Sequence, residues 1–304
     1  MPAHGQDDLQ ELADSISSAA CAFGLTISLQ KTVVLAQAAP RQQVPVPKVK
    51  INGTELQAVD SFPYLGSCLT SDCGMDREIS NRLAKAGASF GRLSNRVWNE
   101  RGLTVQTKIA VYKAVVLTSL LYGCETWTMY SRQLRTLDQF HLRCLRKIMR
   151  ISWEDRTPNT EVLRRAQLWG IEALIMKAQL RWVGHIMRMS DTRLPKIIFL
   201  SELADGARAP GGPIKRYKDG IRATLKACRI AASGWESLAA DRGAWRSAVA
   251  QGVAAYEEQR LQRLERKREA RKERKLDPTI AVACPVCGRL CASQFGLQSH
   301  MRCH

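Results

Sequence analysis

Residues 75–97 read MDREISNRLAKAGASFGRLSNRV, and the spacing of the apolar side chains in this stretch decides the fold class of the chain. Apolar side chains recur in it at steps of three and four residues, at Met75, Ile79, Leu83, Ala86, Phe90, Leu93 and Val97. Such steps place the side chains on one face of an α-helix, because the helix makes a turn about every 3.6 residues. The stretch therefore predicts a long amphipathic helix with one face against a core.

The same helical period returns along the chain up to about residue 230. A second, more buried helix is predicted over residues 104–128, and a third over the stretch marked by Leu134, Leu137, His141, Cys144, Leu145 and Ile148. Further helices are predicted at 160–169, 171–189 and 214–227. Pro210-Gly211-Gly212-Pro213 is the clearest internal loop. Residues 75–230 are therefore predicted to form a helical bundle, which makes the chain mostly α.

A smaller region with β-structure precedes this bundle. Asp7 and Asp8 open a helix that is predicted to end at Gly24, with an apolar face formed by Leu9, Leu12, Ile16, Ala20 and Phe23. Residues 27–35 predict a short strand, and residues 40–47, rich in Pro and Gln, predict a linker. Asn52-Gly53 between alternating apolar residues predicts a β-hairpin, and residues 62–67 are predicted to join it as a third strand.

The charge of the chain indicates a polyanionic partner. Its 46 Lys and Arg outnumber its 28 Asp and Glu, which gives a net charge of +18 and a pI near 9.8. Such an excess repels itself unless a polyanion is near, so nucleic acid is the leading partner and an anionic membrane the second. The membrane alternative is weak, because the longest apolar run, 114–122, is short and contains Thr118 and Ser119. We therefore expect no membrane association and no small-molecule substrate.

The cysteines and the first residues indicate the compartment. Four of the ten cysteines lie in the last 21 residues, and the others are scattered from Cys21 to Cys228. A secreted disulfide scaffold would be smaller and more evenly rich in cysteine. The first residues also lack the basic and apolar segments of a signal peptide. The sequence therefore predicts reduced thiols and a location in the nucleus or cytoplasm.

A long basic helix is predicted after the bundle. The helical region spans residues 235–276, with a final stretch that starts near Asp241 and continues from Trp245 into residues 260–275. Glu265, Glu269 and Glu273 are spaced to form i,i+4 pairs with basic neighbours. The helix is either a solvated spacer or a phosphate-binding stem or nuclear-localisation patch, and these interpretations are compatible. Its candidate nucleic-acid-binding residues are Arg260, Arg263, Arg266, Lys267, Arg268, Arg271, Lys272, Arg274 and Lys275.

Residues 280–304 predict a ββα zinc finger. Cys284 and Cys287 are separated by two residues, twelve residues follow before His300, and His304 comes three residues later. This spacing is typical of four tetrahedral Zn²⁺ ligands, two thiolates and two imidazoles, and such structural zinc contributes roughly 10–16 kcal/mol to folding. The alternatives are an incidental Cys/His cluster, or Cys303 as a ligand although it is one residue short of the pattern.

The other finger residues determine its core and its reading of bases. Leu297 occupies the position of a core leucine, whereas Cys291 stands where an aromatic side chain is usual, and we expect Phe295 to compensate. The positions that face bases would be Ser293, Gly296 and Ser299, which lack the side chains for bidentate base pairing. We therefore expect backbone or single-strand contacts and no sequence-specific recognition.

Two further candidates for catalysis are weak. Asp7 and Asp8 could hold Mg²⁺, but no apolar strand precedes them and a helical period follows, so they are interpreted as residues of a helix cap. His185 has no identifiable nucleophile or carboxylate partner, so a packed or hydrogen-bonded structural histidine is favoured over a general base.

Several motifs resemble those of reverse transcriptases of non-LTR (LINE-type) retrotransposons. In family order they are FGLTISLQKT at 23–32, FPYLGS at 62–67, LYGCETW at 121–127, RWVGHIMRM at 181–189, and GLQSH at 296–300 within the finger. The resemblance covers nearly the whole chain. It implies a palm remnant at residues 1–70, a helical thumb-like domain at 75–230 that grips nucleic acid, and an accessory zinc finger.

The resemblance also implies a loss of activity. The aromatic-x-Asp-Asp motif, the earlier palm aspartate and the endonuclease domain would precede residue 1, and Asp7-Asp8 matches the helix that follows the motif. No catalytic residue is therefore carried over. We expect a truncated, inactive reverse transcriptase fragment that binds RNA or DNA with little sequence preference. The alternative is a host-adopted protein-interaction module with an accessory zinc finger, and a third hypothesis is an active polymerase.

Overall fold

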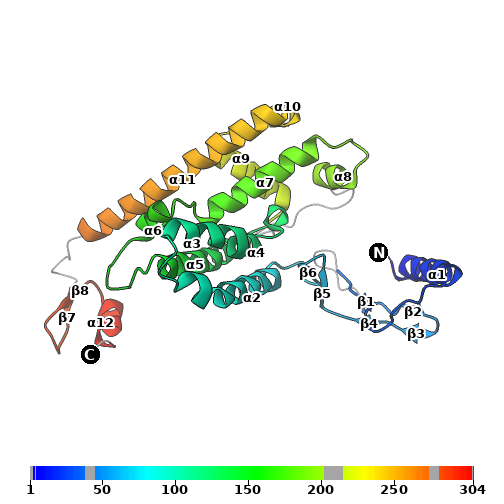
Figure 1. Cartoon of the computed structure of the whole chain (residues 1–304), viewed down its shortest axis with the longest axis horizontal. Coiled ribbons are helices and arrows are strands. Elements are labelled where there is room, and N and C mark those ends of the chain that lie inside the picture. The colour runs from blue at the N-terminus through cyan, green and yellow to red at the C-terminus, as the bar shows by residue number, and fades with distance from the viewer. Residues whose placement is uncertain (1–2, 4, 38–44, 202–214, 274–280, 303) are drawn as a thin grey trace.

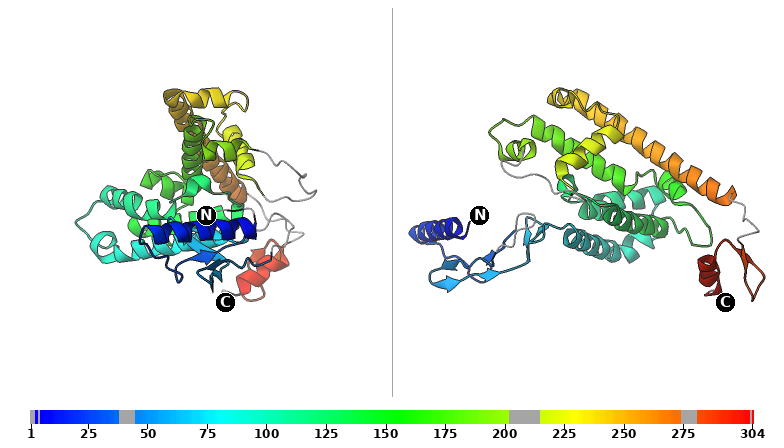
Figure 2. Two further views of the ribbon diagram at one scale, coloured as in Figure 1. Left: turned by 90° about the vertical axis from the view of Figure 1, so that its right-hand side faces the viewer. Right: turned by 180° about the vertical axis from the view of Figure 1, so that it is seen from behind.

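The structure is a computed structural model that describes residues 3, 5–37, 45–201, 215–273, 281–302 and 304. Its elements spread along one long axis (Figure 1). The first helix and the small sheets lie at one end, a helical body occupies the middle, and the last hairpin and helix lie at the other end. The view from behind in Figure 2 shows the same order. The described residues are mostly helical with small β-elements, which confirms the predicted fold class.

The N-terminal module contains one helix and two small sheets. Helix α1 (Gln6–Ala22) ends before Gly24, whose φ of 67° suits glycine. Strand β1 (Val33–Val34) pairs in parallel with β4 (Gln57–Ala58), and β2 (Lys50–Ile51) pairs antiparallel with β3 (Thr54–Glu55). A small core holds the module together, formed by Ala13, Val34, Val49, Ile51 and Leu56.

The predicted β-structure is partly right. The hairpin at Asn52-Gly53 is confirmed, and both residues have the positive φ of a tight hairpin turn. The strand predicted over residues 27–35 is reduced to Val33–Val34. The third strand was also placed wrongly, because β5 (Ser61–Tyr64) pairs with β6 (Ser67–Thr70) as a separate hairpin. Of the predicted linker 40–47, residues 40–44 lie outside the described part.

A buried ion pair joins this second hairpin to the helical body. Glu78 and Arg82 lie one turn apart in α2 (Asp76–Arg92), with 2.6 Å between Glu78 Oε1 and Arg82 Nε. The other Glu78 oxygen accepts the backbone N–H of Cys68 at 2.7 Å, and Arg82 donates to the carbonyl of Gly66 at 2.6 Å. Because both charges are buried and fully partnered, the pair fixes the hairpin against the helix.

The helical body has two cores. The first is enclosed by α2, α3 (Val105–Val111), α4 (Thr118–Leu120), α5 (Ser131–Ile148) and α6 (Asn159–Ala166), with π-helical turns η1 (Ser94–Trp98) and η2 (Tyr112–Leu117). The second lies among α8 (Leu194–Leu200), α9 (Tyr217–Ala227), α10 (Trp235–Ala240) and α11 (Arg242–Glu273). Helix α7 (Ile171–Met187) contributes to both, with Ile171 and Ile175 in the first and Leu180 and Val183 in the second. It therefore links the two cores.

The predicted helices are present with changed ends. The helix predicted over residues 104–128 ends at Leu120. It stops there because Gly123 adopts a φ of 75°, and a 3₁₀ turn, η3 (Cys124–Thr126), follows. The stretch 160–169 ends at Ala166, where Gln167 takes a left-handed conformation. The short helix α8 was not predicted, whereas α10 lies at the start of the predicted helical region 235–276. The loop at Pro210–Pro213 lies outside the described residues.

Candidate metal centre and nucleic-acid interface

A short hairpin positions the two cysteines of the candidate metal centre. Strands β7 (Val282–Ala283) and β8 (Leu290–Cys291) are antiparallel, and the backbone N–H of Cys284 donates to the carbonyl of Arg289 at 2.8 Å. The turn between them is closed by a 2.9 Å bond from the N–H of Gly288 to the carbonyl of Cys284. Gly288 has a φ of 70°, which explains the glycine directly after Cys287. The turn therefore presents both thiols on one side.

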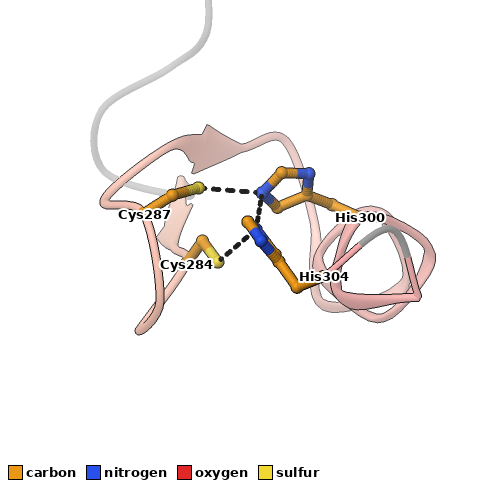
Figure 3. Close-up of side chains that lie close together, drawn as sticks. All are labelled: Cys284, Cys287, His300 and His304. Carbon is orange, nitrogen blue, oxygen red and sulfur yellow. Dashed lines mark hydrogen bonds between the residues drawn. The ribbon is translucent and has the colours of Figure 1, made fainter.

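The two histidines come from the helix that follows. Helix α12 (Gln294–Met301) begins after Ser293, whose Oγ accepts the backbone N–H of Gly296 at 3.1 Å as an N-cap. His300 lies in the last turn of the helix, and His304 lies about one turn further on. This spacing brings both imidazoles to the same side, facing the hairpin (Figure 3).

The four side chains converge on one point. The distance is 3.1 Å from Cys287 Sγ to His300 Nε2, 3.7 Å from Cys284 Sγ to His304 Nε2, and 3.1 Å between the two Nε2 atoms (Figure 3). All four ligand atoms lie within 4.8 Å of one another. Tetrahedral Zn²⁺ with bonds of about 2.0–2.3 Å separates its ligands by roughly 3.3–3.8 Å. The four donor atoms therefore lie close enough together to hold a metal ion.

The finger residues around the ligands form a very small core. Cys284, Cys291 and Leu297 are buried together, and Val282 packs against them. Leu297 is thus in the core as predicted, but Phe295 is 81% exposed and does not compensate for Cys291, so that expectation was wrong. Cys303, the alternative ligand, lies outside the described residues. The described residues of the finger therefore bury little apolar surface.

The backbone N–H groups around Cys284 favour its thiolate, which is the form that binds a metal. The N–H of Cys287 points at the Cys284 sulfur and lowers the pKa of that thiol below its usual range, with a smaller contribution from the N–H of Val286. Hydrogen bonds to the charged form of a group stabilise that form. Since a metal binds the thiolate, the turn prepares Cys284 for coordination.

The first half of helix α11 packs on the body. Its buried residues Trp245, Val249, Val253 and Glu257 follow one another at four-residue steps. Trp245 Nε1 donates to the carbonyl of Leu180 at 2.9 Å, which ties α11 to α7. The helix begins as predicted near Asp241, whose carboxylate accepts the N–H groups of Gly243 and Ala244. This half of α11 is therefore part of the second core.

Arg260 belongs to the body and not to the exposed basic surface. Its side chain is 10% exposed and forms an ion pair with the buried carboxylate of Glu257 at 2.6 Å. Glu257 also accepts the N–H of Gly170 at 2.9 Å, directly before α7. Among the predicted nucleic-acid-binding residues, Arg260 therefore fixes α11 to α7 and has no free guanidinium for phosphate.

The second half of α11 presents its cations to solvent. Arg263, Arg266, Lys267, Arg268, Arg271 and Lys272 are all exposed. Glu265 pairs with Arg164 of α6 at 2.8 Å instead of with a neighbour in its own helix. Arg274 and Lys275 lie outside the described residues. We name the five cations from Arg266 to Lys272 the α11 cationic end.

Asp7, Asp8 and His185, the weaker candidates for catalysis, belong to no cluster that could hold a metal ion among the described residues. Among the described residues, the finger is the one group of three or more His, Cys, Asp and Glu side chains that could hold a metal ion. Asp7 and Asp8 lie in the first turn of α1, as interpreted from the sequence. His185 is exposed beside the Trp182 ring, at a centroid distance of 5.5 Å, and is therefore not packed in the core.

The buried histidine of the body is His141, which sequence reasoning placed only on an apolar helix face. Its Nδ1 lies 2.8 Å from the hydroxyl of Tyr112, and burial lowers its pKa to about 4. The sequence signal was present, because His141 sits in the apolar period of residues 134–148. Its polar partner lies 29 residues away and could not be identified from local spacing.

The quoted sequence motifs meet as packing contacts. The hydroxyl of Tyr122, from LYGCETW, donates to the carbonyl of Leu65, from FPYLGS, at 3.0 Å. The Arg82 guanidinium stacks over the Tyr122 ring at 4.6 Å. Gly184, from RWVGHIMRM, faces Trp245 so closely that an added Cβ would lie 2.0 Å from the indole nitrogen. Through these contacts, three of the motifs position elements of the fold.

These features define a basic, mostly helical protein with a Cys₂His₂ cluster after its longest helix. No described helix is both long and apolar enough to cross a membrane. The chain is similar to a protein of Caenorhabditis elegans named as uncharacterized and transposon-derived, with 25% identity over 253 residues, 79% of this chain and 87% of the worm protein. No family model and no solved structure matches the chain. The similarity indicates a transposable-element origin.

Proposed function

We propose that this chain is a nucleic-acid-binding protein derived from a non-LTR retrotransposon reverse transcriptase. The similarity to a transposon-derived protein supports the origin, and the motifs at 23–32, 62–67, 121–127 and 181–189 support the reverse transcriptase family. The thumb-like domain of the family grips nucleic acid, and the resemblance of the motifs assigns the helical body to that region. The proposed function is therefore binding of RNA or DNA.

The observation that carries this proposal is the α11 cationic end. Five exposed Lys and Arg side chains lie within seven residues, from Arg266 to Lys272, at the end of a helix whose other half is fixed in the body. The Cys₂His₂ cluster follows along the chain. Counterions released from the phosphates drive such binding, and it requires no base contacts.

The finger supports contacts to the backbone of the nucleic acid. Ser293 Oγ already caps α12, and Gly296 has no side chain, so two of the three base-facing positions offer nothing to a base edge. We propose that the cluster binds one structural Zn²⁺ through Cys284, Cys287, His300 and His304. The ion would supply the free energy that the small core lacks.

We also propose that the chain does not polymerise. Asp7 and Asp8 lie in a helix, and among the described residues no third carboxylate joins them to hold a catalytic metal. Purified protein with primed template, nucleotides and Mg²⁺ or Mn²⁺ is expected to incorporate nothing. Incorporation that requires the metal would contradict the inactive assignment while leaving nucleic-acid binding intact.

Matched charge-removal variants test the binding surface. The first variant carries Arg266→Gln, Lys267→Gln and Arg268→Gln, and the control carries Lys31→Gln, Lys48→Gln and Lys50→Gln in the N-terminal module, where all three are also exposed. Both lose the same net charge. We expect the first to bind a duplex more weakly and with a smaller salt dependence, by about 0.9 in log–log slope for each lost phosphate contact. Equal loss in both variants would refute the assignment to α11.

The alternative is a host-adopted interaction module whose body binds another protein. Aromatic residues make up only 6% of the chain, which leaves few side chains for stacking on bases. Leu12, Ile16 and Phe23 of the N-terminal module are exposed and offer apolar contacts to another protein. Cys284→Ala with Cys287→Ala separates the two functions. We expect these changes to weaken nucleic-acid binding; unchanged nucleic-acid affinity, together with a retained protein partner, would favour the interaction module.

A further inference from the structure

Trp153 is the most exposed tryptophan of the chain. It exposes 84% of its surface, whereas Trp98, Trp127, Trp235 and Trp245 are buried and the remaining two, Trp169 and Trp182, are half-buried. A tryptophan that remains in water gives up the large apolar stabilisation that burial would supply. At the tip of a loop, the ring is accessible to a ligand that could cover it.

The loop that carries Trp153 is built from specific hydrogen bonds. The N–H of Ser152 donates to Asp155 Oδ2 at 2.6 Å, and the N–H of Arg156 donates to the carbonyl of Trp153 at 3.2 Å. Arg146 anchors the far side, donating to the Thr157 carbonyl at 2.7 Å. The loop between α5 and α6 therefore presents the indole from a defined turn.

The loop around Trp153 carries charges of both signs. Arg150 and Arg156, three residues to either side, are exposed and both adopt a positive φ, and the exposed Glu154 and Asp155 directly follow the tryptophan. The contrast is Phe23, which is 83% exposed but follows α1, a helix with four acidic residues and no basic one. The charges of this loop balance, so the phosphates of a bound strand would be held by the α11 cationic end, while the indole offers its face to a base.

The loop lies at the same end of the helical body as the α11 cationic end. Helix α6 starts directly after the loop, and its Arg164 pairs with Glu265 just before Arg266. Figures 1 and 2 both show the loop joining α5 to α6 close to the C-terminal end of α11. A strand held by the α11 cationic end would therefore pass near Trp153.

We propose that Trp153 is a stacking platform for an unpaired nucleobase and gives the protein a preference for single-stranded nucleic acid. This inference rests on the proposed nucleic-acid binding and adds the class of strand. In a duplex the faces of the bases are covered by their neighbours, so the indole can stack only on a base that is unpaired. Phosphate contacts at α11 serve single strands and duplexes alike.

Oligonucleotide binding to the full chain tests the proposal, with a single strand and a duplex as probes. For Trp153→Ala we expect about 5- to 150-fold weaker single-strand binding and unchanged duplex binding, since stacking acts on one base. Trp153→Phe should retain most of the affinity, because the ring can still stack. Phe23→Ala, an equally exposed aromatic at the acidic end, is the matched control and should bind like the parent.

Tryptophan fluorescence gives a second readout. The single strand should quench the parent, and Trp153→Phe should lose this quenching while still binding. Unchanged single-strand affinity in Trp153→Ala, or an equal loss for the duplex, would overturn the stacking proposal. If the parent itself binds neither probe, the proposed function fails as well, so the two failures can be distinguished.

Discussion

At the scale of single residues, Gly184 shows why the motif RWVGHIMRM at 181–189 contains a glycine. It lies within α7, three residues before the helix ends, where glycine weakens a helix. The Trp245 indole of α11 fills the space beside it, and an added Cβ would lie 2.0 Å from Nε1 and 2.3 Å from Cδ1. The glycine therefore permits α11 to approach α7 and joins the two helices of the second core.

This contact predicts a large effect of one methyl group. Gly184→Ala should lower the free energy of unfolding by about 1–3 kcal/mol, because the buried ring cannot move without disturbing the core. The control is Gly91→Ala in α2, which has nothing within 4 Å and should gain up to about 1 kcal/mol from helix propensity. Urea denaturation measures both; a neutral or stabilising Gly184→Ala would contradict the packing.

His141 makes stability depend on pH. Burial lowers the pKa of this imidazole to about 4 in the folded protein, whereas an unfolded histidine titrates near 6.5. Between these values the unfolded chain binds a proton that the folded one does not. The neutral ring therefore contributes stability above about pH 6.5 that is lost as the pH falls toward 4.

Comparison with His141→Gln isolates this effect. Glutamine can still bond the Tyr112 hydroxyl and does not titrate. We expect the free energy of unfolding of the parent to fall by up to about 3 kcal/mol more than that of the variant between pH 6.5 and 4. Chemical denaturation at several pH values measures this difference. Parallel pH profiles would show that His141 does not titrate on unfolding.

At the scale of elements, the C-terminal finger and the helical body differ in how much apolar surface they bury. Among its described residues the finger buries only Cys284, Cys291 and Leu297, whereas the body has two extended cores. We expect a chelator to unfold residues 281–304 and to leave the helices from α2 to α11 folded. Amide hydrogen exchange, measured with and without the chelator, locates the change.

Two controls sharpen this experiment. Cys284→Ala should produce the same exchange pattern without a chelator, and added Zn²⁺ should restore protection in the parent alone. A finger that stays protected in chelator and in the variant would contradict the structural role of the metal.

Helices and the finger could be predicted from the sequence because their signals are local. The apolar period predicted α2, α5 and α7, and the Cys/His spacing predicted which four side chains converge. Strands of two residues, such as β1, show no alternation, and α8 spans at most two turns. The role of Arg260 depends on Gly170, which Glu257 reaches across 87 residues of sequence, so helix composition alone could not show it.

At the scale of the whole molecule, charge is distributed unevenly along the axis. Helix α1, at one end, carries Asp7, Asp8, Glu11 and Asp14 and no cation (Figure 1). The α11 cationic end and the finger lie toward the other end. We therefore expect a polyanion to approach the protein from the side of α11.

The central claim is that phosphate contacts hold this protein on nucleic acid, and the salt dependence of Kd tests it most directly. We expect the log of the association constant to fall linearly with the log of salt concentration between about 50 and 200 mM, with a slope of roughly −0.9 for each duplex phosphate contacted. Several exposed cations on α11 and in the finger predict a slope of several units. A binding constant that does not change with salt would contradict the account.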